Sequence, residues 1–172
     1  MLTTHLNGTQ VGSGTQIDFT APGVSATNDG SKTTYDLSKV INYVEVAVST
    51  AEMLAIRATP KTLVAAPGAG KVLEFVSAVF IYDYAAAYTE SADNLAVRYT
   101  DGSGTVVSLT LETTGLLDAT ADKVSTIQPL ATDVLMTANA ALVLHNTGDG
   151  EFGGTGSPCR VKVAYRVHST GL

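Results

Sequence analysis

Residues Arg57 to Tyr84, RATPKTLVAAPGAGKVLEFVSAVFIYDY, form the most apolar long stretch of the chain. Two β-type runs, Thr62 to Ala66 and Val72 to Tyr84, flank the five residues from Pro67 to Lys71. Because proline fixes φ and the two glycines permit positive φ, these five residues predict a turn that joins two strands into a central hairpin. From Val76 to Tyr82 both alternating faces are apolar, which predicts the centre of a sheet that is buried on both sides.

Short segments with alternating apolar residues recur on both sides of this stretch. They are Val40 to Val48, Leu95 to Tyr99, Val107 to Leu111, Ala141 to Asn146 and Arg160 to His168. In the last segment Val161, Val163, Tyr165 and Val167 are expected to face the core, with charged side chains opposite them. Strands at regular intervals, with turn residues between them, predict an all-β fold, an antiparallel β-sandwich or jelly roll.

One short helix is expected between the segment Val40 to Val48 and the run Thr62 to Ala66. Ser49 and Glu52 have the spacing of a capping box, and Pro60 ends the helix within two turns. Residues 115–140 show no clear pattern apart from a strand-like run at Lys123 to Gln128.

The first 35 residues differ in composition from the rest of the chain. They are rich in Gly, Thr, Ser and Asn, and their main apolar residues include Val11, Ile17 and Phe19. Too few apolar residues are present to fold this segment alone, so residues 1–35 are expected to form an extended N-terminal arm. Residues 36–172 are then the β-sandwich domain.

The chemical balance of the chain argues against several classes of partner. A net charge of −6, with 10 Lys and Arg against 16 Asp and Glu, gives no basic surface for nucleic acid. No apolar run approaches the length that spans a membrane, and the N-terminus lacks the features of a secretory signal. The single Cys159 cannot close an intramolecular disulfide and is expected to be a small buried hydrophobe.

No motif for catalysis, metal or cofactor binding has the required residues. Gly70-Lys71 resembles part of a phosphate-binding loop, but Ala65 and Val72 occupy positions that need Gly and Ser or Thr. The three histidines show no ligand spacing, and no nucleophile elbow or calcium loop occurs. We therefore expect no enzymatic activity, cofactor or metal.

Several segments together resemble a family of viral structural proteins. They are Arg57 to Val64, Ala66 to Val72, Leu95 to Gly102, Leu142 to Gly148 and Arg160 to Val167. With them, Glu52 to His168 resembles small β-sandwich proteins that decorate and cement the capsids of tailed bacteriophages. The resemblance implies a jelly-roll-like domain, a homo-oligomer that is commonly a trimer, and binding to the major capsid protein on the exterior of the virion.

The resemblance transfers no residue roles, so candidate contacts come from the residues themselves. Val11, Ile17 and Phe19 are expected to anchor the N-terminal arm on partner subunits. Phe80 and Tyr82 are the candidates for an apolar self-association contact, with burial inside the domain as the alternative. The alternative function is a tail or fibre module for host attachment, which exposed aromatic residues in a loop would favour.

Overall fold

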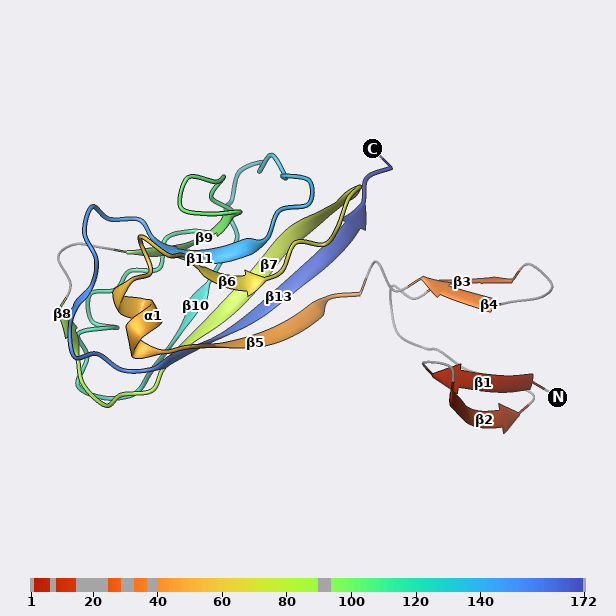
Figure 1. The fold of residues 1–172 in the computed structure, drawn as a ribbon, viewed down its shortest axis with the longest axis horizontal. Helices are drawn as coiled ribbons and strands as arrows, with labels where there is room; N and C mark the ends of the chain where they lie inside the picture. The colour runs from red at the N-terminus through yellow and green to blue at the C-terminus, as the bar shows by residue number, and fades with distance from the viewer. Residues whose placement is uncertain are drawn as a thin grey trace. The chain divides into compact units, whose positions relative to one another are not determined.

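The computed structural model describes the backbone of residues 2–6, 9–14, 25–28 and 33–36, and all of residues 40–89 and 94–171. The chain divides into two compact units, Met1–Val40 and Ile41–Leu172. In the first unit, β1 (Leu2–Leu6) pairs with β2 (Thr9–Gly14), and β3 (Ser25–Asn28) pairs with β4 (Thr33–Asp36), both antiparallel (Figure 1). The backbone thus forms two hairpins where the sequence predicts an extended arm. The role of residues 1–35 as a docking arm stays a prediction.

The second unit contains two larger antiparallel sheets. One has the order β10-β7-β13-β5 and the other the order β6-β11-β9, and Figure 1 shows each as a separate layer. The strands are β5 (Asn42–Val48), β6 (Lys61–Val64), β7 (Lys71–Tyr82), β9 (Leu95–Tyr99), β10 (Lys123–Ile127), β11 (Leu142–Asn146) and β13 (Cys159–Ser169). Short strands β8 (Tyr88–Thr89) and β12 (Gly153–Gly154) form a separate pair. The predicted all-β, antiparallel class is confirmed.

Both sheets contribute to one hydrophobic core. Phe80, Val161 and Val163 from the four-stranded sheet lie in the same buried cluster as Val97 and Leu144 from the three-stranded sheet. Fully burying such a side chain contributes about 1.5–3 kcal/mol, so this shared cluster is the main attraction between the sheets. The finer assignment as a β-sandwich or jelly roll stays a prediction.

The two runs of the opening stretch form strands, but they do not form a hairpin. β6 pairs with β11, whereas β7 lies between β10 and β13 in the other sheet. Asn139 contacts this connection at both ends: its Oδ1 accepts from the Gly68 amide at 2.9 Å, and its amide donates to the Lys71 carbonyl. The predicted central hairpin is therefore wrong, while the central place of β7 in a sheet is confirmed.

A β-bulge explains the apparent burial of both faces of β7. Phe75 pairs with Tyr165 and Ser77 pairs with Ala164, which leaves Val76 as an extra residue without a partner on β13. The extra residue at Val76 therefore shifts by one position which side chains of β7 face the core, and the alternation of inward and outward side chains continues beyond it. Since Val79 and Ile81 on the other face are only half-buried, the predicted two-sided burial of β7 is wrong.

The helix and the last strand form as the sequence predicts. In α1 (Thr50–Leu54) the Ser49 hydroxyl accepts from the Glu52 amide, and the Glu52 carboxylate accepts from the Ser49 amide at 2.8 Å, which completes the capping box. In β13, Val161 and Val163 are fully buried, and Tyr165 and Val167 pack against the core as half-buried residues.

The predicted strands Leu95 to Tyr99 and Val107 to Leu111 pair only irregularly. β9 forms, but the returning chain contacts it through isolated bridges between Leu95 and Leu111 and between Arg98 and Val106. Ser108 bridges Pro129 in turn, so this returning segment joins the three-stranded sheet to the chain that follows β10.

Candidate functional site

The two aromatic residues predicted to contact a partner lie inside the protein. Phe80 and Tyr82 are both 0% exposed, and the Tyr82 hydroxyl donates to the Ala86 carbonyl at 2.8 Å. Rings that are fully surrounded by their own domain have no surface to offer, so their predicted role in self-association is wrong. The bulge at Val76 is the physical reason, because it turns both rings towards the core.

The predicted anchors of the N-terminal segment cannot be compared in the same way. Val11 lies on the backbone of β2, and its side chain lies outside the described part of the molecule. Ile17 and Phe19 lie outside the described residues altogether. Their role as anchors stays a prediction.

The described cysteine and histidine side chains do not form a common site. Cys159 and His168 lie at the two ends of β13, and His145 lies on β11. Cys159 is 1% exposed, and burial, with a smaller effect from the Asp83 charge, raises the pKa of its thiol to about 12. It is the small buried hydrophobe that was expected. His145 lies buried on β11, while His168 lies on β13 with its Nε2 at 2.7 Å from the Glu74 carboxylate.

Within the described residues, no group of three His, Cys, Asp or Glu side chains is arranged to hold a metal ion. Of the helical segments in the described part of the chain, none has the length and apolar character needed to cross a membrane.

The outer face of the four-stranded sheet carries two clusters of paired charges. In the Arg160 cluster, Arg160 bonds both Asp83 and Glu45, and Glu45 also lies 3.3 Å from the Lys162 amine. Hydrogen bonds from Arg160 and Lys162 hold the pKa of Glu45 below its usual value, and those from Arg160 do the same for Asp83. Because these charges pair with one another, the cluster is a set of solvent-exposed ion pairs between strands.

The Glu74 cluster lies at the other end of the same sheet. The Glu74 carboxylate accepts from Arg166 at 2.9 Å and lies 2.7 Å from the His168 ring. Burial raises the pKa of Glu74, but hydrogen bonds from His168 and Arg166 outweigh it, so this pKa lies below its usual value. The carboxylate is thus ionised and already paired near neutral pH.

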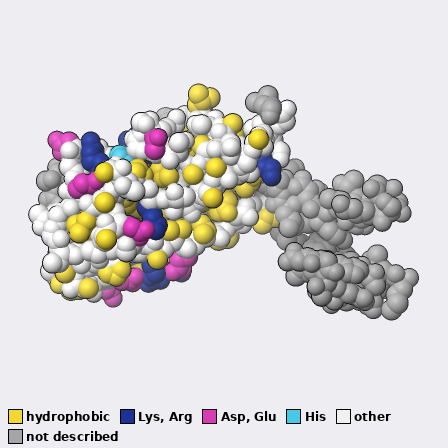
Figure 2. Space-filling model, in the orientation of Figure 1, with side chains coloured by type: hydrophobic (Ala, Val, Ile, Leu, Met, Phe, Trp, Pro, Cys, Tyr) yellow, Lys and Arg dark blue, Asp and Glu magenta, His cyan; other side chains and the backbone are white. Residues whose placement is uncertain are grey.

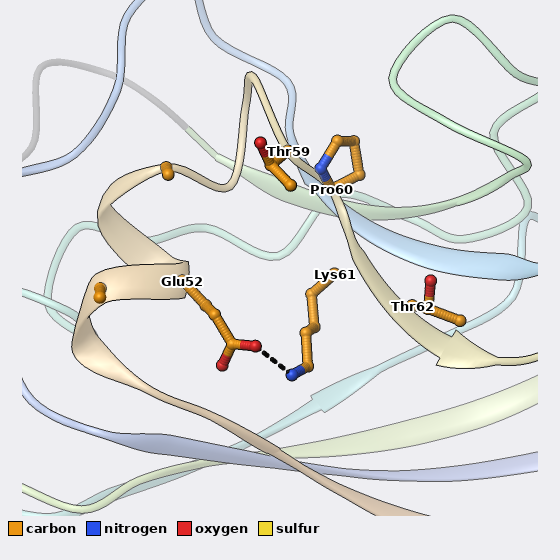
Figure 3. A pocket seen from close by; sticks show the side chains of 7 residues that line it. Glu52, Thr59, Pro60, Lys61 and Thr62 are labelled. Carbon is orange, nitrogen blue, oxygen red and sulfur yellow. Dashed lines mark hydrogen bonds and ion pairs between the residues drawn. The ribbon is translucent and has the colours of Figure 1, made fainter.

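The hollows of the described surface include two with different linings. The first lies between α1 and the start of β6, where Figure 3 shows the ion pair of Glu52 and Lys61 beside Thr59 and Thr62. The Lys61 amine lies 2.5 Å from the Glu52 carboxylate. Hydrogen bonds from Lys61 and Ser49 lower the pKa of Glu52 to about 2. The charged groups of this hollow are therefore occupied with each other.

The second hollow has a different character. We call it the loop groove, because one wall is the chain from Pro129 to Met136 and the other is formed by β7, β9 and the segment after β9. Its volume is about 450 Å³. Apolar side chains dominate its lining: Phe75, Tyr99, Val107, Leu130, Val134 and Met136. Glu74 and Asp133 are also among its lining residues, and the Glu74 carboxylate is paired with Arg166 and His168.

Large apolar side chains are exposed beside the loop groove. Leu135 is 86% exposed, Met136 is 40% exposed, and Leu109, whose amide donates to Gln128 just before the loop, is 47% exposed. Figure 2 shows hydrophobic atoms distributed over much of the face in view. The sequence interpretation missed this surface because residues 115–140 show no period. The available signal was the unpatterned apolar run Val134-Leu135-Met136.

Among the residues that the structure describes, exposed aromatic side chains do not gather near the groove. Tyr43, 77% exposed, lies on β5, and Tyr84, 39% exposed, follows β7. Tyr43 pairs with Ala164, whereas Tyr82 pairs with Cys159, so the two exposed rings lie at different levels of the sheet. The larger aromatic cluster of Tyr82, Tyr88 and Phe152 is buried.

The chain was compared with protein-family models, with curated proteins and with solved structures, and no match was found in any of the three.

Proposed function

We propose that this protein is a non-enzymatic structural protein of a virion, which binds and stabilises a bacteriophage capsid as a decoration or cement protein. The single observation that carries the proposal is the loop groove, an apolar hollow whose lining includes the exposed Met136 and whose loop wall also carries the exposed Leu135. The resemblance of the strand segments to capsid decoration proteins supplies the kind of partner.

Exposed leucine and methionine side chains beside a hollow favour contact with another protein. Each Å² of apolar surface removed from water contributes about 25 cal/mol, and continuous apolar patches on a soluble surface commonly mark interaction sites. The opposite sheet face differs, since its charges are already paired in the Arg160 and Glu74 clusters. Within the described part of the chain, the loop groove is therefore a surface that would gain from a partner.

The proposed partner is the major capsid protein, and the proposed location is the outside of the virion. A homo-oligomer, with a trimer favoured by the resemblance, belongs to the same proposal. In a cement protein, contacts with several subunits at once raise the overall affinity without any new kind of contact, because each later contact is intramolecular. This accounts for how modest single surfaces stabilise a large particle.

Binding to particles tests the proposal directly. The purified full chain would be added to capsids that lack it, and the bound fraction would be measured by co-sedimentation together with the melting temperature of the capsid. We expect saturable binding and a higher capsid melting temperature. Leu135→Asp should weaken binding strongly. Val124→Asp, at a 69% exposed site on β10, places the same charge elsewhere and should have little effect.

Two results would contradict the proposal. One is the absence of binding by a full chain whose thermal melt shows that it is folded. The other is equal loss of binding in the Leu135→Asp and Val124→Asp variants, which would mean that the loop groove is not the contact.

A further inference from the structure

We infer that residues 100–104, the turn that follows β9, act as a pH-sensitive latch: the turn packs on the buried ring of His145 and opens when this ring gains a proton. We call residues 100–104 the latch turn. The inference goes beyond the proposed function and does not depend on it, because it concerns a local movement within the domain and involves no partner.

The ring of His145 is buried although it lies on the outer face of a sheet. β11 and β9 are neighbours in the three-stranded sheet (Figure 1), and Leu144 belongs to the core cluster, so the next residue, His145, lies on the opposite face. Only 7% of its surface is exposed. The latch turn supplies cover, since a Cβ at Gly102 would lie 2.4 Å from Nε2 of the ring. The backbone of Gly102 therefore packs directly against the imidazole.

A proton on this ring is poorly stabilised while the turn covers it. Nδ1 is buried without a hydrogen-bond partner among the described residues. Burial, followed by the charges of Arg98 and Arg57, lowers the pKa of His145. A backbone hydrogen bond with Arg57 and the charge of Glu151 act in the opposite direction and are outweighed. The closed turn thus disfavours the charged imidazole.

The two carboxylates that attract the ring have other hydrogen-bond donors. Glu151 accepts from the amides of Arg57 and Ala58 at 2.9 and 2.7 Å. Asp101, within the latch turn, accepts from the amide and the hydroxyl of Ser103 at 2.8 and 2.7 Å. Their effect on His145 is that of a nearby charge, so it reduces the cost of the buried proton only in part.

The latch turn begins at a strained residue. Thr100 has a φ of 64°, in the left-handed region that a β-branched residue rarely occupies. Contacts on both sides hold it there: its amide donates to the Ala141 carbonyl at 2.9 Å, and the Tyr99 amide donates to the Thr105 carbonyl at 3.0 Å. Because this strain is released when the turn lifts, opening costs less free energy here than at a relaxed turn.

Opening of the turn would let water reach His145. In the open form the ring titrates near its ordinary pKa of 6.5, whereas in the closed form its pKa is lower. The open form therefore binds the proton more readily. The closed turn is fully favoured above pH 6.5, and the open turn gains as the pH falls from there towards the lowered pKa.

Amide hydrogen exchange of the full chain, followed by NMR, tests this inference. Rates are expressed as protection factors, which removes the intrinsic effect of pH on exchange. The Gly104 amide donates to the Asp101 carbonyl, and its protection factor should fall at least about threefold between pH 7.5 and pH 5. At both pH values it should lie well below that of Val163 on β13, which reports global unfolding. His145→Gln should abolish the fall at Gly104.

Variants that change the charge around the ring separate the latch from a general loss of stability. Asp101→Asn keeps the oxygen that accepts from Ser103 but removes an attracting charge, so the loss of protection in acid should grow about twofold, with no change at pH 7.5. Arg57→Gln removes a repelling charge and should reduce that loss about twofold. Lys123→Gln, a matched loss of one positive charge on β10, should leave the loss unchanged.

The inference is overturned if the Gly104 protection factor changes with pH in His145→Gln as it does in the unchanged protein. It is also overturned if Gly104 and Val163 have equal protection factors, because the turn would then open only with the whole domain. If His145→Gln does not fold, the opposite effects expected for Asp101→Asn and Arg57→Gln decide the question. Effects of the same sign, or no effect in either variant, would reject the latch.

Discussion

Arg160 holds the Asp83 carboxylate with two parallel hydrogen bonds, Nε to Oδ2 and Nη2 to Oδ1, each 2.8 Å long. The pair joins β13 to the residue that directly follows β7. Because a guanidinium and a carboxylate are both planar, this geometry fixes orientation as well as distance. The two residues are 77 positions apart in the chain, so the pair is a long-range contact between β13 and the end of β7.

Removal of this guanidinium should be visible at Asp83. Hydrogen bonds from Arg160 hold the pKa of Asp83 below its ordinary value of 3.8, so Arg160→Gln should raise the pKa of Asp83 towards that value. Carboxyl carbon shifts followed by NMR across acidic pH provide the measurement. Lys162→Gln is the control, because Lys162 contacts Glu45 and leaves both bonds to Asp83 in place. An unchanged Asp83 pKa in Arg160→Gln would contradict the assignment.

The inward and outward faces of β13 predict very different costs. Val163→Asp would bury an unpaired charge in the core and should lower the free energy of unfolding by about 4 kcal/mol or more. Arg166→Ala removes only a half-exposed ion pair with Glu74 and should cost about 0.5 kcal/mol. Denaturant titrations of both variants measure the difference. Equal losses would show that the two faces have been assigned the wrong way round.

Glycine is required at one turn of the β9 loop. A Cβ at Gly104 would lie 1.7 Å from the Tyr99 carbonyl oxygen, so Gly104→Ala must displace backbone and should cost about 2 kcal/mol or more. Gly153→Ala is the matched control, since a Cβ there would meet its nearest neighbour at 3.6 Å. Thermal melts should show a clear loss only for Gly104→Ala. A comparable loss at Gly153 would point to backbone entropy or strand effects instead of the close approach.

His145 should make the protein less stable in mild acid. Burial, followed by the charges of Arg98 and Arg57, lowers the pKa of His145 from 6.5, and Nδ1 is buried without a hydrogen-bond partner among the described residues. Asp101 and Glu151 oppose this only in part. The unfolded chain therefore binds the proton more readily, so stability is complete above pH 6.5 and falls as the pH drops from there towards the lowered pKa.

Melting temperatures between pH 7.5 and pH 5 test this dependence. His145→Gln keeps a polar side chain without a titrating group, and its melting temperature should fall less over this range. If His145→Gln loses as much melting temperature as the unchanged protein, other groups cause the acid sensitivity.

Local patterns in the sequence predicted local structure well. The capping box at Ser49 and Glu52 and the inward residues of β13 depend on neighbours within a few positions, and both formed as expected. The hairpins of the N-terminal unit were missed although Asn7-Gly8, a dipeptide that favours hairpin turns, lies between β1 and β2. The polar composition of this segment favours an arm, while its turn residues favour a hairpin.

Long-range pairing was the part that the sequence could not specify. Nothing in the residues from Pro67 to Lys71 indicates that β6 will pair with β11 instead of β7, because β11 lies far along the chain. The loop groove was missed for the same reason. Its walls come from Phe75, Val107 and Val134, which only the tertiary fold brings together.

The position of β13 between β7 and β5 has a consequence for biosynthesis. Arg160 and Glu45, which meet across this sheet, are 115 residues apart, and β13 leaves the ribosome after both of its neighbours. Until it arrives, β5 and β7 each present an unpaired edge, and contacts of such high sequence separation form slowly. Nascent chains that stall before Cys159 would therefore be prone to aggregate, and chaperones that shield strand edges should act on this protein late in its synthesis.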